Sequence, residues 1–276
     1  MKNILIFGKN GQVASNLIKI FSQKNTFDIT TYSSSDVDFA NLPALENLLN
    51  NLPKKPDFII NAAAYTNVDG AEDEKEKADL INHKAVEVIA KYAAKNNVKL
   101  IYYSTDYVFD GSGDKPFSED NTKNLHPLNY YGKTKLDGEK AIINSGCSYW
   151  IFRISWVWDE NPNQKNFVNT ISRLAREREL LTIIDDQIGS PTNANFVAKK
   201  TVKFIEENNL NSGIYHLNNG KYISWYQFAI EIVDNLRKKG EVLAVKEIKP
   251  IKSSEYKTKA IRPLNSRLSN NKLNLA

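Results

Sequence analysis

Two tyrosines and two lysines lie within six residues of the sequence, in the stretch YYGKTK from Tyr130 to Lys135. A phenol has a pKa of about 10, so at neutral pH it exchanges protons readily only when a nearby ammonium stabilises the phenolate. On a helix, residues four apart are offset by about 40° around the axis, and residues five apart by about 140°. Tyr131 can therefore act with Lys135, and Tyr130 with Lys133 remains the geometric alternative. Either pair predicts proton transfer to or from a substrate oxygen.

A hydroxyl that holds a substrate carbonyl is the expected third member of such a site. The stretch STDYVFDG follows an apolar run, and ligands of open α/β sheets bind at the carboxyl ends of the strands. Thr105 is the predicted hydroxyl, and its neighbour Ser104 is the alternative. Together with the tyrosine and lysine, this residue favours chemistry at a substrate carbonyl.

Glycines lie directly after the first apolar run, in ILIFGKNGQVASNL. Gly8, Gly11 and Ala14 form a G-x-x-G-x-x-A pattern. A dinucleotide pyrophosphate needs a tight turn, a residue without a side chain where backbone meets phosphate, and a helix N-terminus with free N–H groups. The pattern predicts such a site, with a plain strand-to-helix turn as the alternative.

The end of the second strand-like run bears on the choice of nicotinamide cofactor. An acidic residue there binds the ribose hydroxyls of NAD and repels the extra phosphate of NADP. Here the run ends at Tyr32, three serines follow, and Asp36 and Asp38 come later. Both NADPH and NADH therefore remain open.

Strand-like and helical runs alternate through the first half of the chain. Short apolar runs separated by helices predict a parallel sheet covered on both faces, in a Rossmann-type doubly wound α/β fold. The expected strands span residues 3–8, 27–32, 57–63, 98–105 and 149–155, and the expected helices 12–23, 43–52, 78–96 and 130–144. Later helices are expected at 165–178, 194–209 and 224–239, around short strands near 181–185 and 213–217. We expect a mainly dinucleotide-binding domain at 1–156 and a smaller, partly interleaved lobe at 157–276, with some of its segments returning to the main sheet.

Composition excludes several classes of protein. The 276 residues are 41% hydrophobic and 25% charged, which is typical of a globular protein. A net charge of +5 comes from 37 basic and 32 acidic residues that are scattered, so no nucleic-acid partner is expected. No apolar stretch has the length of a signal peptide or membrane span, and the lone Cys147 fits a reducing compartment. We therefore expect a cytoplasmic protein without a membrane partner.

Eight segments, in order along nearly the whole chain, resemble the dTDP-4-dehydrorhamnose reductase family of extended short-chain dehydrogenases/reductases. They are GKNGQV, NAAAYTNVDGAE, STDYVFDG, YYGKTKLDGE, RISWVW, DDQIGSPT, GIYHLNNGKYISWYQFA and RPLNSRL. The resemblance implies a Rossmann-type domain with a smaller C-terminal lobe that binds a sugar nucleotide. It also implies the reduction of the 4-keto group of dTDP-4-dehydro-6-deoxy-L-mannose to dTDP-L-rhamnose, with NADPH or NADH.

The resemblance selects Tyr131 with Lys135, and adds Thr105, as the catalytic set. It implies that Tyr131 protonates the forming alkoxide, that Lys135 lowers the pKa of the phenol and holds the nicotinamide ribose, and that Thr105 orients the carbonyl. The implied cofactor-binding residues are Gly8, Gly11, Gln12, Val13, Asp38, Phe39, Ala62, Ala63, Tyr65, Tyr131 and Lys135. The implied substrate-binding residues are Thr105, Asp106, Tyr107, Trp156, Asn166, Phe167, Gln187, Thr192, Arg262 and Asn265. For Trp156 the alternative is a core aromatic, and for Arg262 it is a surface ion pair.

Metal binding is not expected. Some members of the family hold magnesium at a dimer interface, with glutamates after the glycine turn and after the Pro-Thr of DDQIGSPT. Asn16 and Asn195 stand at the equivalent positions and lack the charge that a hard cation prefers. We therefore expect no magnesium site, and a monomer or weak homodimer. His83, His126 and His216 show no ligand-like spacing.

Two other functions fit many of the same residues. A sister sugar-nucleotide reductase or epimerase would use the same pocket chemistry on a different base or hexose. A non-catalytic, NADP-binding regulatory subunit would keep the cofactor site, but the intact Thr105, Tyr131 and Lys135 count against it. Family members usually add a short segment after RPLNSRLSNNKL, so a truncated C-terminus stays open.

Overall fold

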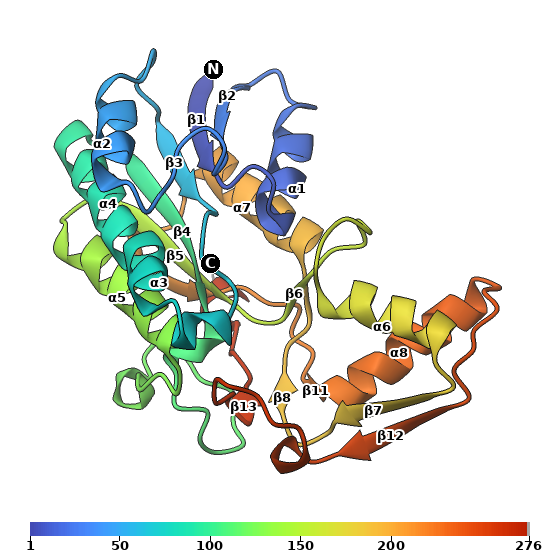
Figure 1. Cartoon of the computed structure of the whole chain (residues 1–276). Helices are drawn as coiled ribbons and strands as arrows, with labels where there is room; N and C mark the ends of the chain where they lie inside the picture. Colours follow the sequence, from blue (N-terminus) through green and yellow to red (C-terminus); the bar gives the residue numbers. More distant parts are fainter. Residues whose placement is uncertain (275–276) are drawn as a thin grey trace.

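The computed structural model describes residues 1–274, and its largest element is a six-stranded parallel sheet (Figure 1). The strand order is β10-β5-β4-β3-β1-β2. The strands are β1 Lys2–Phe7, β2 Phe27–Tyr32, β3 Phe58–Asn61, β4 Lys99–Thr105, β5 Tyr149–Ile154 and β10 Gly213–His216. Their register aligns fully buried apolar side chains in a row across four strands, namely Ile6, Ile60, Ile101 and Trp150. The expected doubly wound α/β fold is confirmed.

Helices cover both faces of this sheet (Figure 1). On one face, α1 Gln12–Phe21 packs against α7 Ala194–Glu207. The other face is covered by α2 Leu42–Asn50, α4 Ala85–Asn96 and α5 Tyr130–Asn144. Helices α1, α2, α4 and α7 bury apolar side chains against the strands, which is how helices in such folds are stabilised. Helix α5 differs, because Thr134, Lys135 and Glu139 are among its buried residues.

A π-helical turn interrupts the helix that the sequence predicts at 78–96. The chain forms α3 Lys75–Asp79, then the π turn Leu80–Lys84, and continues as α4. The fully buried Asn82 in this turn bonds through its side-chain amide to both the N–H and the C=O of Tyr65 and to the hydroxyl of Thr134. The turn therefore ties the segment after β3 to helix α5.

Most of the chain after residue 156 builds a separate small lobe, seen at the lower right of Figure 1. Its helices α6 Phe167–Glu177 and α8 Trp225–Lys238 pack over the parallel pair β7 Leu180–Ile184 and β12 Glu247–Ile251. The sequence did not predict β12, because Glu247, Lys249 and Pro250 break its apolar pattern.

Short elements complete the connections. The short strands are β6 Val157–Trp158, β8 Ile188–Gly189, β9 Thr192–Asn193, β11 Ile223–Ser224 and β13 Asn265–Ser266. The short helical segments are the 3-10 turns Gly70–Glu72, Asp106–Val108, Thr122–Asn124 and Ser253–Glu255, and α9 Asn271–Asn274. Within the described part of the chain, no helix has the length and apolar character needed to cross a membrane.

Candidate active site

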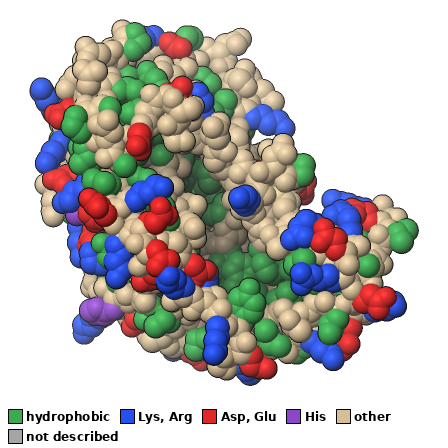
Figure 2. Space-filling view, in the orientation of Figure 1, with side chains coloured by type: hydrophobic (Ala, Val, Ile, Leu, Met, Phe, Trp, Pro, Cys, Tyr) green, Lys and Arg blue, Asp and Glu red, His purple; other side chains and the backbone are tan. Residues whose placement is uncertain are grey.

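A cleft of about 620 Å³ opens at the carboxyl ends of the central strands, between the sheet and the lobe (Figure 2). It brings together ten of the residues predicted from the sequence, namely Gly11, Gln12, Val13, Ala62, Ala63, Thr105, Asp106, Tyr131, Lys135 and Trp156. The remaining lining residues are Ala64, Thr66, Tyr103, Ser104, Ile154, Val157, Asn163, Gln164 and Lys165. Apart from Ser104, sequence reasoning missed this second group.

The glycine turn at one end of the cleft fits a dinucleotide. Gly8 has a φ of 84°, and a Cβ there would lie 2.7 Å from the carbonyl carbon of Ala62. Gly11 caps helix α1 without a side-chain hydrogen bond, so the first N–H groups of the helix keep their capacity to bind an anion. A tight backbone cradle beside a helix N-terminus is the arrangement that a pyrophosphate requires.

A loop of the lobe reaches over this turn. The side-chain amide of Asn166 donates to Gln12 Oε1 at 2.9 Å, and that of Gln164 donates to the carbonyl oxygen of Asn10 at 2.8 Å. Asn166 also caps α6, because its Oδ1 accepts from the N–H of Asn169. Lys165, between the two amides, brings a cation to the cleft. A run of amides and a lysine just before a helix was the available sequence signal.

Helix α5 presents Tyr131 and Lys135 to the cleft. A Cβ on Gly132 would lie 2.2 Å from the carbonyl oxygen of Tyr107, so the helix lies unusually close to the turn after β4. The alternative pair lies outside the cleft. The Tyr130 ring and the Lys133 ammonium contact each other at 5.5 Å instead.

Thr105 and Lys135 are buried and Tyr131 is half-buried, and this environment shifts the pKa values of the phenol and the ammonium. Burial, together with the charge of Asp106, raises the pKa of Tyr131, while a hydrogen bond with Thr105 opposes that effect. Burial lowers the pKa of Lys135 to about 7, and its Nζ donates to the carbonyl oxygen of Tyr103 at 2.7 Å. Burial also raises the pKa of Asp106 to about 6, and Thr105 Oγ1 donates to its Oδ1 at 3.1 Å. At neutral pH the site therefore holds a protonated phenol beside a lysine near its titration point.

Three predicted cofactor residues and Gly8 lie outside the cleft lining. The backbone of Gly8 lies closely against that of Ala62. The exposed Asp38 accepts from the N–H of Ala40, and the buried Phe39 packs edge-on against Phe7. The Tyr65 hydroxyl donates to Glu74, which raises the pKa of Tyr65 to about 12. Contacts of Asp38, Phe39 and Tyr65 with a cofactor stay predictions.

The remaining predicted substrate residues lie outside the cleft lining, and their contacts with a substrate stay predictions. The Tyr107 ring packs edge-on against Tyr131, with centroids 5.9 Å apart. Phe167 packs against Trp225 in the lobe, and Gln187 and Thr192 are buried. The side chain of Asn265 donates to the carbonyl oxygens of Ser112 and Lys115.

Arg262 forms an ion pair with Asp69 in the loop after β3. Its Nη2 lies 2.7 Å from Asp69 Oδ2, and its Nη1 lies 3.1 Å from Oδ1. The backbone N–H of Ala260 also donates to Asp69 Oδ1 at 2.9 Å. This single carboxylate therefore ties the segment around Arg262 to the dinucleotide-binding side of the cleft.

The two asparagines at the predicted family positions meet each other. Asn195 Nδ2 donates to Asn16 Oδ1 at 3.2 Å, and Asn16 donates in turn to Asp159. Amides thus occupy these positions, and the absence of a magnesium site stays a prediction.

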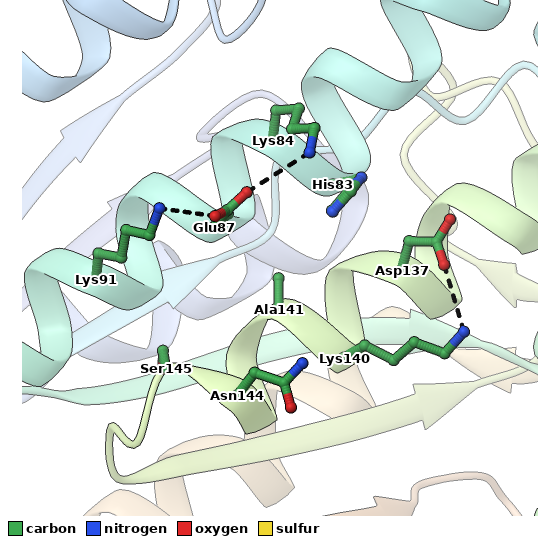
Figure 3. Close-up of a pocket in the computed structure, with 9 residues that line it drawn as sticks. All are labelled: His83, Lys84, Glu87, Lys91, Asp137, Lys140, Ala141, Asn144 and Ser145. Atoms are coloured by element: carbon green, nitrogen blue, oxygen red, sulfur yellow. Dashed lines mark hydrogen bonds and ion pairs between the residues drawn. The ribbon is translucent and has the colours of Figure 1, made fainter.

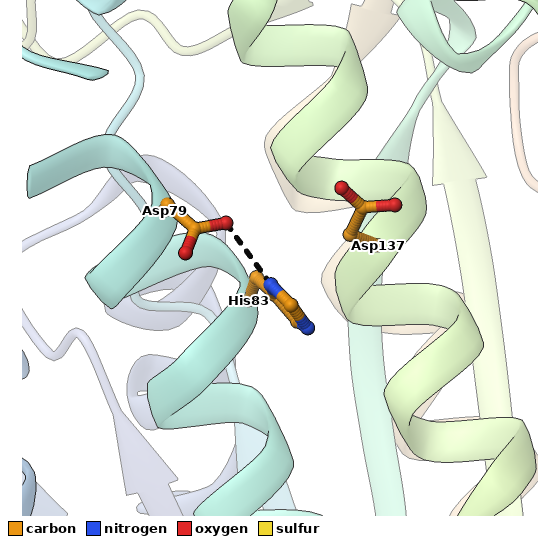
Figure 4. Close-up of side chains that lie close together, drawn as sticks. All are labelled: Asp79, His83 and Asp137. Carbon is orange, nitrogen blue, oxygen red and sulfur yellow. Dashed lines mark hydrogen bonds and ion pairs between the residues drawn. The ribbon is translucent and has the colours of Figure 1, made fainter. Parts of the chain in front are cut away.

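A second hollow, of about 360 Å³, lies between α4 and α5, away from the cleft (Figure 3). Near it, Asp79, His83 and Asp137 come within 4.8 Å of one another (Figure 4). His83 pairs with Asp79 at 3.0 Å, and Lys133 and Lys140 both pair with Asp137. Two lysines therefore already pair with the Asp137 carboxylate, and we assign the cluster no metal.

Comparison with known proteins gives the same match along the whole chain. The family model described as the RmlD substrate binding domain matches residues 1–276. The dTDP-4-dehydrorhamnose reductase of Salmonella typhimurium is 42% identical over 98% of this chain and 90% of its own length, and the Escherichia coli K12 reductase is equally similar.

Solved structures agree. A dTDP-4-dehydrorhamnose reductase from Clostridium acetobutylicum has a TM-score of 0.89 at 34% identity, covering 99% of this chain and 92% of that one. The Bacillus anthracis reductase, solved in complex with NADP, has a TM-score of 0.88 at 32% identity, covering 100% of this chain and 93% of that one. The chain therefore belongs to the dTDP-4-dehydrorhamnose reductase family.

Proposed function

We propose that the protein reduces the 4-keto group of dTDP-4-dehydro-6-deoxy-L-mannose to give dTDP-L-rhamnose, the last step in making that activated sugar. The observation that supports this most directly is the meeting of Thr105, Tyr131 and Lys135 in one cleft with the glycine turn. The named relatives, one solved in complex with NADP, support a nicotinamide cofactor and this substrate. When bound, the dihydronicotinamide supplies the hydride for carbon 4 of the sugar.

The chain's own residues handle the oxygen of the reacting carbonyl. Tyr131 gives its phenolic proton to the forming alkoxide, and the raised pKa of this phenol keeps the donor protonated at neutral pH. Thr105, already in contact with the phenol, orients the carbonyl oxygen. The Lys135 ammonium holds the nicotinamide ribose and stabilises the phenolate that remains after proton transfer.

The glycine turn and the lobe bind different ligands, the cofactor and the sugar nucleotide. The Gly8–Gly11 turn and the start of α1 bind the pyrophosphate of the cofactor. The lobe, with residues 157–276 as its main source, receives the sugar nucleotide, and Trp156 provides a flat apolar wall. We further propose that the protein works in the cytoplasm as a monomer or weak homodimer.

The deciding experiment offers dTDP-4-dehydro-6-deoxy-L-mannose to the purified protein with NADPH and then with NADH, and follows cofactor oxidation. We expect turnover with at least one cofactor and dTDP-L-rhamnose as the product. No oxidation with either cofactor would reject the proposal. Faster turnover of the matching UDP-sugar would favour a sister sugar-nucleotide reductase.

A further inference from the structure

A buried ion pair lies directly behind the catalytic helix. Arg153 on β5 donates from Nε to Glu139 Oε1 at 2.9 Å and from Nη2 to Oε2 at 2.7 Å, and both side chains are 1% exposed. Such a pair is a weak source of stability, because moving two charges out of water costs about as much as their attraction returns. Its position next to the active site indicates an electrostatic role.

The pair lies one helical turn from Lys135. Glu139 follows Lys135 by four residues on α5, so the two side chains share one face of the helix. The Lys135 ammonium donates to the Tyr103 carbonyl oxygen at 2.7 Å and lies 3.9 Å from the centroid of the Tyr102 ring. Both partners lack a formal charge. Among the described residues, no carboxylate forms an ion pair with this ammonium.

The other titratable groups around Lys135 cannot replace Glu139. They are Tyr102 and Tyr103 on β4, Asp106 and Tyr107 in the following turn, Tyr131 on α5 and Arg153 on β5. Burial raises the pKa of each of the four phenols, so all of them are neutral. Asp106, whose pKa burial raises to about 6, keeps a carboxylate at neutral pH, but that carboxylate accepts from the Thr105 hydroxyl and forms no ion pair with Lys135. Burial lowers the pKa of Lys135 to about 7, and the charge of Glu139 opposes this effect.

We propose that Glu139, clamped by Arg153, is a positioning residue whose charge keeps the buried Lys135 ammonium protonated. Arg153 fixes the orientation of the carboxylate through two parallel hydrogen bonds. The consequence for catalysis rests on the proposed function, because it needs Lys135 to act on the cofactor and the phenol. The charge state of Lys135 itself can be measured in the free protein.

The first test is an NMR titration of the protein labelled with ¹³C at the lysine side chains, with the Lys135 signal identified by its loss in Lys135→Met. We expect Glu139→Gln to lower the titration midpoint of Lys135 by about one pH unit, the size of effect that a nearby opposite charge produces. Glu139→Asp keeps the charge and should keep the midpoint near that of the native protein. An unchanged midpoint in a folded Glu139→Gln protein would overturn the proposal.

Asp137→Asn is the matched control on the same helix. It removes the same charge two residues from Lys135, but Asp137 faces outward and pairs with the exposed Lys133 and Lys140. We expect no change in the Lys135 midpoint in this variant. A shift equal to that of Glu139→Gln would mean that any carboxylate on α5 suffices, and would also overturn the proposal.

A double variant keeps the test possible if Glu139→Gln does not fold. If Glu139→Gln unfolds because Arg153 is left unpaired, Glu139→Gln with Arg153→Gln removes both buried charges. We expect a smaller downward shift of the Lys135 midpoint in the same direction, and an unchanged midpoint would again reject the proposal.

The kinetic readout comes second. With the dTDP-sugar and NADPH, kcat/KM should fall as the pH rises above the Lys135 midpoint. We expect the midpoint of this fall to be about one pH unit lower in Glu139→Gln than in the native protein. Glu139→Asp should keep the native pH profile. A lowered Lys135 midpoint without turnover of the sugar would uphold the inference and reject the proposed substrate, so the two failures are distinguishable.

Discussion

Trp156 lies face to face with Trp225: the ring centroids are 3.4 Å apart and the ring planes differ by 8°. The backbone of Trp156 has a φ of 47°, in the left-handed region that bulky residues rarely adopt. A Cβ on Gly189 would lie 2.3 Å from Cε2 of this ring, so the Gly189 backbone also fixes it. The lobe therefore holds one wall of the cleft in a strained conformation.

Removing the partner ring should loosen this wall. We expect Trp225→Ala to raise KM for the sugar nucleotide by about threefold to tenfold, since an aromatic pair contributes about 0.5–1.5 kcal/mol beyond burial. The Kd for NADPH, measured by fluorescence titration, should stay the same because Trp225 is outside the glycine turn. Trp158→Phe, a change elsewhere in the lobe, is the control with native KM. Equal KM values in Trp225→Ala and the native protein would contradict this role.

The proton donor can be tested by removing one oxygen atom. Tyr131→Phe should lower kcat by roughly a hundredfold to ten-thousandfold, the range for general acid catalysis, and leave the Kd for NADPH intact. Tyr130→Phe on the same helix is the matched control, because its ring lies outside the cleft against Lys133. Steady-state turnover and cofactor titration on both variants give the answer. Retained turnover in Tyr131→Phe would remove it from the mechanism.

The main sheet could be predicted well from the sequence, because its buried strands consist of short apolar runs. The strand β12 was missed because an exposed pair in the lobe needs no such run, and its charged residues and Pro250 hide it. The π turn around Asn82 was equally hidden, since it depends on hydrogen bonds to residues 17 and 52 positions away.

Helical spacing limited the catalytic pair to two choices, and the structure places only Tyr131 and Lys135 at the cleft. The partner of Arg262 could not be foreseen, because Asp69 lies 193 residues away and the pair forms only when the lobe folds back. The residues of the loop around Lys165 were missed for the same reason. Local patterns identify chemistry on single elements, whereas contacts across the cleft depend on the tertiary fold.

Asp69 should matter for substrate binding through the segment that it ties down. We expect Asp69→Asn to raise KM for the sugar nucleotide several-fold, because it removes the negative charge that pairs with Arg262 and replaces Oδ2, the acceptor of Arg262 Nη2, with an NH2 group. The NADPH Kd should stay unchanged. Asp73→Asn is the matched control: Asp73 pairs with the exposed Lys259, and such surface pairs contribute about 0–1 kcal/mol. If both variants behave alike in substrate titrations, the tie around Asp69 has no part in binding.

The cradle at the glycine turn should not tolerate a methyl group. In Gly8→Ala the added methyl group would meet the Ala62 backbone, and the φ of 84° would be strained. We therefore expect a higher Kd for NADPH and a lower Tm. Gly146→Ala separates the two effects, because Gly146 has a φ of 75° but no atom within 4 Å of the added carbon. It should lower Tm alone, by strain of about 1–3 kcal/mol. An unchanged NADPH Kd in Gly8→Ala would place the pyrophosphate elsewhere.

His216 should make the free energy of unfolding depend on pH. It is fully buried, its Nδ1 lies 3.1 Å from the Ser269 carbonyl oxygen, and burial, helped by the charge of Arg153, lowers its pKa to about 3. In the unfolded chain the pKa of this histidine is about 6.5. Between that pH and about 3, the imidazole is protonated in the unfolded state and neutral in the native state. The contribution of this residue to the free energy of unfolding is therefore full above a pH of about 6.5. It is lost as the pH falls toward about 3, by at most about 1.4 kcal/mol per pH unit.

Urea unfolding at several pH values in this window measures the effect. The free energy of unfolding should fall more steeply with decreasing pH in the native protein than in His216→Gln. The control is His83→Gln, at a half-buried surface pair, which should follow the native slope. Parallel slopes in the native protein and His216→Gln would mean that the buried imidazole is already charged.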